Sequence, residues 1–143
     1  MKIVGIIPAR YASVRFPGKP LAPLAGRPMI LHVLDAARSA RRLDRVAVAT
    51  DDERIARTVR EAGGEAVMTS PLAASGTDRL VEAAGALTAN VYVNIQGDEP
   101  MMSPENIDRA VEALLEGPQR KIATLAIPLA ASGAADPNMV KVA

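Results

Sequence analysis

The sequence has no cysteine and very few aromatic or histidine residues. Its 143 residues include 2 Tyr, 1 Phe, no Trp and a single histidine, His32. Without cysteine the chain can form neither a structural disulfide nor a thiolate metal site, and one histidine argues against a polyhistidine zinc site or a Ser-His-Asp triad. Only oxygen ligands remain for a metal ion. The core must be aliphatic, because hydrophobic residues make up 49% of the chain and aromatic residues only 2%.

The chain also lacks an excess of charge of one sign and a long hydrophobic run. Lys and Arg number 17 against 16 Asp and Glu, so the net charge of +1 gives no overall field that would favour nucleic acid or an anionic membrane. The first apolar run, Ile3 to Ile7, is too short for a signal-peptide core, and no later run approaches a membrane span. We therefore expect a cytoplasmic protein with no nucleic-acid or membrane partner.

Apolar runs alternate along the chain with segments of helical periodicity. We expect strands at Lys2 to Ile7, Arg45 to Ala49, Ala66 to Met68, Val91 to Ile95 and Ile122 to Ile127. We expect helices from Pro28 to near Ala40, after the capping residues Thr50-Asp51-Asp52 up to Gly63, from near Thr77 with Leu80, Val81 and Ala84 inward, and from Glu105 to Glu116. His32 falls beside the apolar stripe of its helix, and the charges from Asp51 to Arg60 are typical of a solvated face.

This order predicts a three-layer α/β fold with a mostly parallel, Rossmann-like sheet and helices on both faces. No repeat or linker divides the chain, so residues 1–143 are expected to form a single domain. Sheets of this kind bind ligands beyond the carboxyl ends of their strands. Three polar segments follow strands or begin helices there and are candidates for a site.

The first polar segment is the basic loop, which runs from Pro8 to Pro20 directly after the first strand. Arg10 and Lys19 can donate to phosphate oxygens, Ser13 can donate a hydroxyl hydrogen bond, and Gly18 lets the backbone approach a ligand. The loop lacks the spacing of a Walker motif and has no Gly-x-Gly-x-x-Gly pattern. A phosphate-binding loop and a merely solvated basic loop both remain open at this point.

The other two segments are Ser75 to Arg79 and Gln96 to Pro100. The former offers backbone amides at a helix start that favour anions, or it only caps that helix. The latter carries the carboxylates of Asp98 and Glu99, which could hold magnesium or could belong to a simple turn. Cations for phosphate and a carboxylate for magnesium at one sheet edge together favour binding of a nucleoside triphosphate.

Five stretches in sequence order carry a family resemblance. They are IPARYASVRFPGKPL (residues 7–21), ATDD (49–52), SGTDR (75–79), VNIQGDEP (93–100) and DPNMVKV (136–142). Together they resemble the CMP-Kdo synthetases, also called 3-deoxy-manno-octulosonate cytidylyltransferases. Phe16 stands where that family usually has Leu, which exchanges one apolar side chain for another.

The resemblance implies transfer of CMP from CTP to the sugar acid Kdo with release of pyrophosphate and with magnesium as cofactor, for lipopolysaccharide synthesis. It implies catalytic roles for Arg10, Lys19 and Asp98, with Asp98 as the magnesium ligand. The residues that it implies for nucleotide and substrate binding are Pro8, Ala9, Arg10, Ser13, Arg15, Lys19, Ser75, Thr77, Arg79 and Gln96.

Family members continue well beyond the last of these motifs, into a segment that supplies a second carboxylate, much of the Kdo pocket and most of a homodimer contact. The chain is therefore expected to hold the nucleotide-binding part of the domain, with an unpaired sheet edge, low stability and a tendency to self-associate. A non-catalytic CTP-binding module is one alternative. A synthetase of the CMP-sialic acid type is another, although the QGDEP segment favours the Kdo enzymes.

Overall fold

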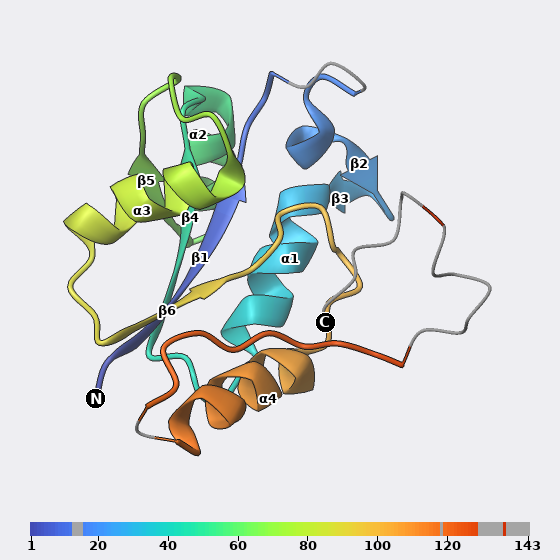
Figure 1. The fold of residues 1–143 in the computed structure, drawn as a ribbon. Helices are drawn as coiled ribbons and strands as arrows, with labels where there is room; N and C mark the ends of the chain where they lie inside the picture. Colours follow the sequence, from blue (N-terminus) through green and yellow to red (C-terminus); the bar gives the residue numbers. More distant parts are fainter. Residues whose placement is uncertain (13–15, 118, 129–135, 137–143) are drawn as a thin grey trace.

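The computed structural model describes residues 1–12, 16–117, 119–128 and 136. Its centre is a four-stranded sheet in the order β5-β4-β1-β6, in which every neighbouring pair is parallel (Figure 1). The strands are β1 (Ile3–Ala9), β4 (Arg45–Thr50), β5 (Glu65–Met68) and β6 (Val91–Asn94). Strand β1 is hydrogen-bonded on both sides, with Gly5 opposite Val46 of β4 and Val93 of β6.

The two central strands are apolar along nearly their whole length because both of their faces are covered. Six of the seven residues of β1 and five of the six of β4 are buried. Successive side chains of a strand point to opposite faces, so Ile6 and Ile7 enter different layers of the core. Both are fully buried.

Helices cover both faces of the sheet, which confirms the expected three-layer α/β class (Figure 1). They are α1 (Met29–Arg38), α2 (Glu53–Glu61), α3 (Gly76–Ala86) and α4 (Pro104–Leu115). On one face, Ile7 packs in a cluster with Leu34 of α1, Ile55 of α2 and Ile107 of α4. On the other face the cluster contains β1 and β4 residues together with Ala83 of α3 and Leu87 directly after it.

The helix starts follow the expected caps. Asp52 caps α2, where its Oδ1 accepts from the Arg54 backbone N at 2.9 Å. Ser75 caps α3, where its Oγ accepts from the Asp78 backbone N at 3.1 Å. Helix α2 ends before Gly63, whose φ of +70° is the left-handed conformation in which glycine is common after a helix.

A short structural segment between β1 and α1 was not predicted. It consists of a 3-10 turn, η1 (Lys19–Leu21), and a small hairpin of β2 (Pro23–Leu24) and β3 (Arg27–Pro28). His32 lies beside the buried stripe of α1, as expected, and its Nε2 lies 2.8 Å from the carbonyl O of Leu24. His32 therefore links the hairpin to α1.

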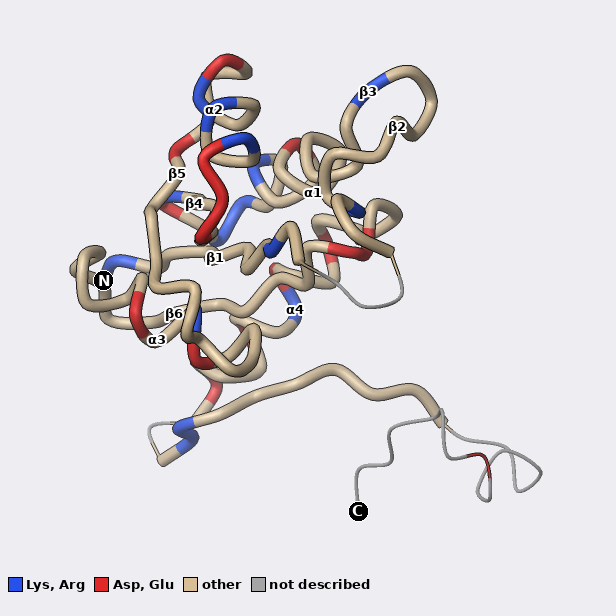
Figure 2. Tube along the Cα trace, turned by 90° about the horizontal axis from the view of Figure 1, so that it is seen from above, with Lys and Arg blue, Asp and Glu red and all other residues tan. Residues whose placement is uncertain are grey.

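The expected strand from Ile122 to Ile127 is absent from the described part of the chain. Residues 119–128 run as an extended piece without ladder hydrogen bonds, at the edge of the molecule in Figure 2. A groove of about 600 Å³ is lined by β6, α4 and residues 121–125, and no ladder pairs this segment with β6. Ile122 and Ile127 are each 88% exposed. High β-propensity alone was therefore insufficient to form a strand.

The expected inward face of α3 was also partly wrong. Val81 is exposed, while Leu80 and Ala84 only border the core. The inward positions are instead Arg79, Ala83 and Leu87, at intervals of four residues. A buried arginine takes the first of these places, which a pattern of apolar residues could not show.

Among the described residues, no helix is long and apolar enough to cross a membrane. In Figure 2, basic and acidic residues alternate over the body of the molecule rather than gathering on one face.

We expect Leu34→Ala to lower the free energy of unfolding by about 2–5 kcal/mol, because it removes a fully buried side chain from the larger cluster. The matched control is Leu72→Ala, since Leu72 is 89% exposed and the same change there should alter stability by less than about 0.5 kcal/mol. Urea denaturation followed by circular dichroism measures both variants. Equal losses would contradict the described core.

Candidate functional site

The carboxyl ends of β1 and β6 approach each other closely. Ile95 N donates to Ile6 O at 3.0 Å, directly after β6 ends. At Gly97, a Cβ atom would lie 2.6 Å from the carbonyl O of Pro8, closer than any side chain permits. Glycine at this position therefore lets the segment after β6 lie against the end of β1, which brings Asp98 to the basic loop.

The two described ends of the basic loop are joined by one backbone hydrogen bond. Gly18 N donates to Tyr11 O at 2.8 Å, and Gly18 has a φ of +71°, a conformation that favours glycine. Gly18 directly precedes η1, so this turn sets the position of Lys19 at the start of η1.

Lys19 and Asp98 form an ion pair across the two segments. Lys19 Nζ lies 2.9 Å from Asp98 Oδ2, and the side chains are 38% and 57% exposed. An exposed pair of this kind contributes about 0–1 kcal/mol to stability. Its importance is therefore positional, because residues 79 apart in sequence present opposite charges at one point.

A cleft of about 680 Å³ opens at this point, which is within the usual size range of small-molecule sites. Eight of the residues singled out in the sequence line it: Pro8, Ala9, Arg10, Lys19, Ser75, Arg79, Gln96 and Asp98. Thr77 is not among the lining residues, and Ser13 and Arg15 lie outside the described residues. Phe16, Pro20, Met29, Ala73, Ala74, Gly76 and Gly97 complete the wall.

Helix α3 starts at the wall of the cleft. Its cap Ser75 and first residue Gly76 both line the cleft, and a Cβ on Gly76 would lie 3.4 Å from the Pro8 side chain. The helix start therefore packs against the end of β1. The partial positive charge of a helix N-terminus favours an anion or a ligand carbonyl nearby.

Arg79 lines the cleft but its guanidinium is already bound to the protein. Nη2 donates to Asp51 Oδ2 at 3.0 Å and Nη1 donates to Thr69 Oγ1 at 2.6 Å. The Arg79 and Asp51 side chains are only 3% and 15% exposed. This buried pair connects α3 to the carboxyl ends of β4 and β5. The geometry thus favours a supporting role for Arg79 over direct ligand binding.

Two residues of this site were missed or misread in the sequence. Asp51 belonged to the charges interpreted as a solvated face, yet its side chain is only 15% exposed and pairs with Arg79. Tyr11 received no role, yet its ring lies under the guanidinium of Arg54, whose Cζ is 3.4 Å from the ring centroid. An arginine in the first turn of a helix, such as Arg54 or Arg79, gives no sequence signal for either contact.

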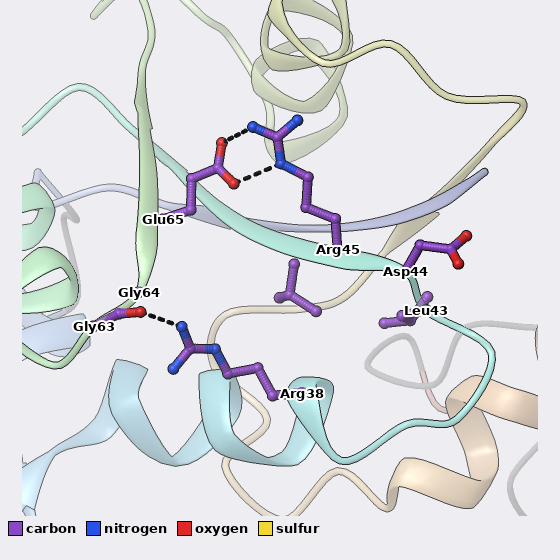
Figure 3. Close-up of a pocket in the computed structure, with 8 residues that line it drawn as sticks. Arg38, Leu43, Asp44, Arg45, Gly63, Gly64 and Glu65 are labelled. Atoms are coloured by element: carbon purple, nitrogen blue, oxygen red, sulfur yellow. Dashed lines mark hydrogen bonds and ion pairs between the residues drawn. The ribbon is translucent and has the colours of Figure 1, made fainter.

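A second hollow, of about 420 Å³, lies at the amino ends of β4 and β5 (Figure 3). The two arginines that line it are engaged by the protein: Arg38 Nη2 donates to Gly63 O, and Arg45 Nε donates to Glu65 Oε2 at 2.6 Å. The pKa of Arg45 is raised chiefly by this hydrogen bond to Glu65. This hollow offers no unpaired cation and lies at the sheet edge opposite to the one where such folds bind ligands.

A parallel α/β sheet with charged groups at a cleft beyond its strand ends is typical of the nucleotide-binding class of α/β proteins. The family model described as cytidylyltransferase matches residues 4–143, and the chain therefore belongs to the cytidylyltransferase family.

Relatives and a solved structure agree with the resemblance found in the motifs, which is thereby confirmed. The 3-deoxy-manno-octulosonate cytidylyltransferase of Anaeromyxobacter sp. (strain K) is 58% identical over 139 residues, covering 96% of this chain and 56% of the relative. That of Syntrophobacter fumaroxidans is 53% identical over 99% of this chain and 58% of the relative. A structure described as CMP:2-keto-3-deoxy-manno-octonic acid synthetase complexed with CTP matches with a TM-score of 0.81 and 44% identity, over 83% of this chain and 49% of that one. The chain thus spans about half the length of the proteins that it matches.

We expect Arg79→Met to lower the free energy of unfolding by about 3 kcal/mol, because it leaves the partly buried Asp51 carboxylate without its cation. The control is Arg42→Met in the exposed pair with Glu112, which should lower it by about 0–1 kcal/mol. Adding Asp51→Asn to Arg79→Met should restore part of the loss. Chemical denaturation measures all variants, and similar losses in Arg79→Met and Arg42→Met would show that the buried pair is not structural.

Proposed function

We propose that this chain carries the CTP-binding part of an enzyme that transfers CMP from CTP to Kdo. In that reaction a hydroxyl oxygen of Kdo attacks the α-phosphorus, the bond to the bridging oxygen breaks, pyrophosphate leaves and the hydroxyl proton is lost. The 2.9 Å contact of Lys19 with Asp98 is the observation that carries the proposal. This contact supports a site at which the Lys19 ammonium and the Asp98 carboxylate can both act on one triphosphate.

The cations of the basic loop are suited to the phosphates. Arg10 is exposed on the cleft wall, and Lys19 is half-exposed beside it. Arginine binds phosphate oxygens through a planar fork and lysine binds them as a compact charge. We assign to both residues the neutralisation of the triphosphate and of the charge that develops on the departing pyrophosphate. Ser13 and Arg15 remain proposed phosphate contacts outside the described residues.

The remaining wall suits a nucleoside. Ala9, Ala73 and Ala74 offer small side chains, and the start of α3 at Ser75 offers backbone groups for a base or ribose. Pro8 also lines the cleft, as does the exposed Gln96, to which we assign a contact with the sugar acid. Thr77 lies in the first turn of α3, and we propose that it contacts the nucleotide from there.

The family implies magnesium, and Asp98 fits that ion. Magnesium usually keeps several waters and binds through one or two carboxylates together with substrate phosphates. Asp98 is such a carboxylate, more than half exposed at the cleft, while the described residues contain no cluster of three or more candidate ligands. When bound, magnesium would supply positive charge to the phosphates. The chain's own contribution is to place the Asp98 carboxylate beside Lys19.

A non-catalytic CTP-binding role is the second candidate. The observation in its favour is that the cleft holds most of the predicted nucleotide contacts. For the whole protein, Kdo as acceptor and a homodimer are likewise proposals.

We expect release of pyrophosphate from CTP, Kdo and magnesium, with less release when UTP replaces CTP. Lys19→Ala should lower kcat on the order of 100-fold, because it removes a charge that acts on the reacting phosphates. Lys121→Ala is the control, since Lys121 is exposed and lines the groove beside β6 instead. A coupled pyrophosphate assay measures turnover.

If no pyrophosphate forms, the melting temperature in CTP decides between the two candidates. A ligand at one hundred times its dissociation constant stabilises a protein by about 2.7 kcal/mol, which a thermal melt detects. Stabilisation by CTP without turnover supports the binding module. If CTP gives no turnover and no stabilisation, both candidates are refuted.

We expect Asp98→Asn to abolish the gain in CTP affinity that magnesium confers. Without magnesium, the variant should bind CTP at least as well as the wild type, because removal of the carboxylate frees Lys19 and removes a repulsion of phosphate. Glu99→Gln is the matched control, as Glu99 is the adjacent carboxylate and lines the other groove. Titration calorimetry with and without EDTA measures the CTP affinity of the wild type and of both variants. Loss of the magnesium effect in Glu99→Gln rather than in Asp98→Asn would overturn the assignment.

A further inference from the structure

Tyr11 connects the basic loop to α2. It follows Arg10 directly, and its half-buried ring packs against the larger aliphatic cluster. The Arg54 guanidinium lies over that ring, with Cζ 3.4 Å from the centroid. Neither Tyr11 nor Arg54 lines the cleft, so neither is placed to touch a ligand there.

Arg54 is itself held in place by Asp52, the cap of α2. Its Nε donates to Asp52 Oδ1 at 3.0 Å and its Nη2 donates to Oδ2 at 2.7 Å. This hydrogen bonding lowers the pKa of Asp52, and the same bonding, together with Tyr11, raises the pKa of Arg54. Both groups therefore stay charged near neutral pH. Two parallel bonds fix the guanidinium plane above the ring.

Tyr11 also contacts the far end of the loop. Its carbonyl O accepts from Gly18 N, and its ring carbons lie 3.0 Å from where a Gly18 Cβ would be. Gly18 directly precedes η1, whose first residue is Lys19. One residue thus touches both the segment with Arg10 and the turn with Lys19.

We propose that Tyr11 and Arg54 are positioning residues that hold the basic loop against the start of α2. Their contact fixes the described parts of the loop around Tyr11 and Gly18 before any ligand binds, so that less freedom is lost when Arg10 and Lys19 engage phosphates. This proposal rests on the proposed function, in which the basic loop binds a nucleoside triphosphate. The contact itself is a property of the free protein and can be tested without a ligand.

The first test is Arg54→Ala. A cation over an aromatic ring near the surface changes the equilibrium between the closed and the open loop by about two- to fivefold. We expect exchange of the Gly18 amide hydrogen, measured by NMR, to quicken by that factor, and the dissociation constant for CTP with magnesium to rise by that factor. Arg57→Ala is the matched control, because Arg57 is an exposed arginine of α2 for which the described residues offer no ion pair. It should change neither quantity.

The second test separates the ring from the hydroxyl. Tyr11→Phe keeps the aromatic face and should retain wild-type exchange at Gly18 and wild-type CTP affinity. Tyr11→Ala should lose both. A melting temperature for each variant, and unchanged exchange of core amides in β1, show whether the fold is intact.

The outcomes are distinct. Unchanged Gly18 exchange in Arg54→Ala would overturn the contact as a restraint on the loop. Faster exchange with unchanged CTP affinity would overturn the positioning role and leave a structural contact. If the wild type binds no CTP, the proposed function fails and the positioning role fails with it, while the exchange experiment still shows whether Arg54 restrains the loop.

Discussion

The central position of β1 is the constraint on which the rest of the structure depends. Because β1 pairs with β4 on one side and β6 on the other, the segments that follow these three strands leave the sheet at the same edge. The missing side chain of Gly97 then allows the chain after β6 to lie against Pro8. Arg10, Lys19 and Asp98 are brought together by this backbone arrangement rather than by attraction between their charges.

The charges of the molecule fall into two groups with different physical roles. Arg79 is buried and bonded to the partly buried Asp51 and to Thr69, and it thereby connects α3 to the ends of β4 and β5. Lys19 and Asp98 are exposed and contribute little to stability. The buried pair therefore holds the walls of the cleft, while the exposed charges inside it remain available to a ligand.

Much of this arrangement could be predicted from the sequence, because the signals were local. The alternation of apolar runs located four strands and four helices, and short polar residues located the two segments in which the caps Asp52 and Ser75 lie. The three polar segments were expected to lie close together because parallel strands end at the same edge of the sheet. The family resemblance contributed the chemistry, which periodicity could not supply.

The features that escaped prediction depend on contacts between residues distant in sequence. The pairing of Asp51 with Arg79 and the stacking of Arg54 on Tyr11 exist only after the sheet has formed. The Ile122 to Ile127 segment has the composition of a strand, but a strand needs a partner backbone, and a groove separates this segment from β6. Strand composition predicts suitability for a sheet and not the presence of a partner.

The exposed pair of Lys19 and Asp98 has a consequence for ligand binding. In the free protein each group partly neutralises the other, so the cleft carries no isolated buried charge. A triphosphate would attract Lys19, and a divalent cation would attract Asp98. Each ligand therefore weakens the Lys19–Asp98 ion pair and frees the side chain that binds the other ligand. Since the pair is exposed, its separation costs at most about 1 kcal/mol. Ligand binding can therefore exchange one weak ion pair for two stronger ones. Bound triphosphate should increase the affinity of the protein for the cation, and bound cation should increase its affinity for the triphosphate.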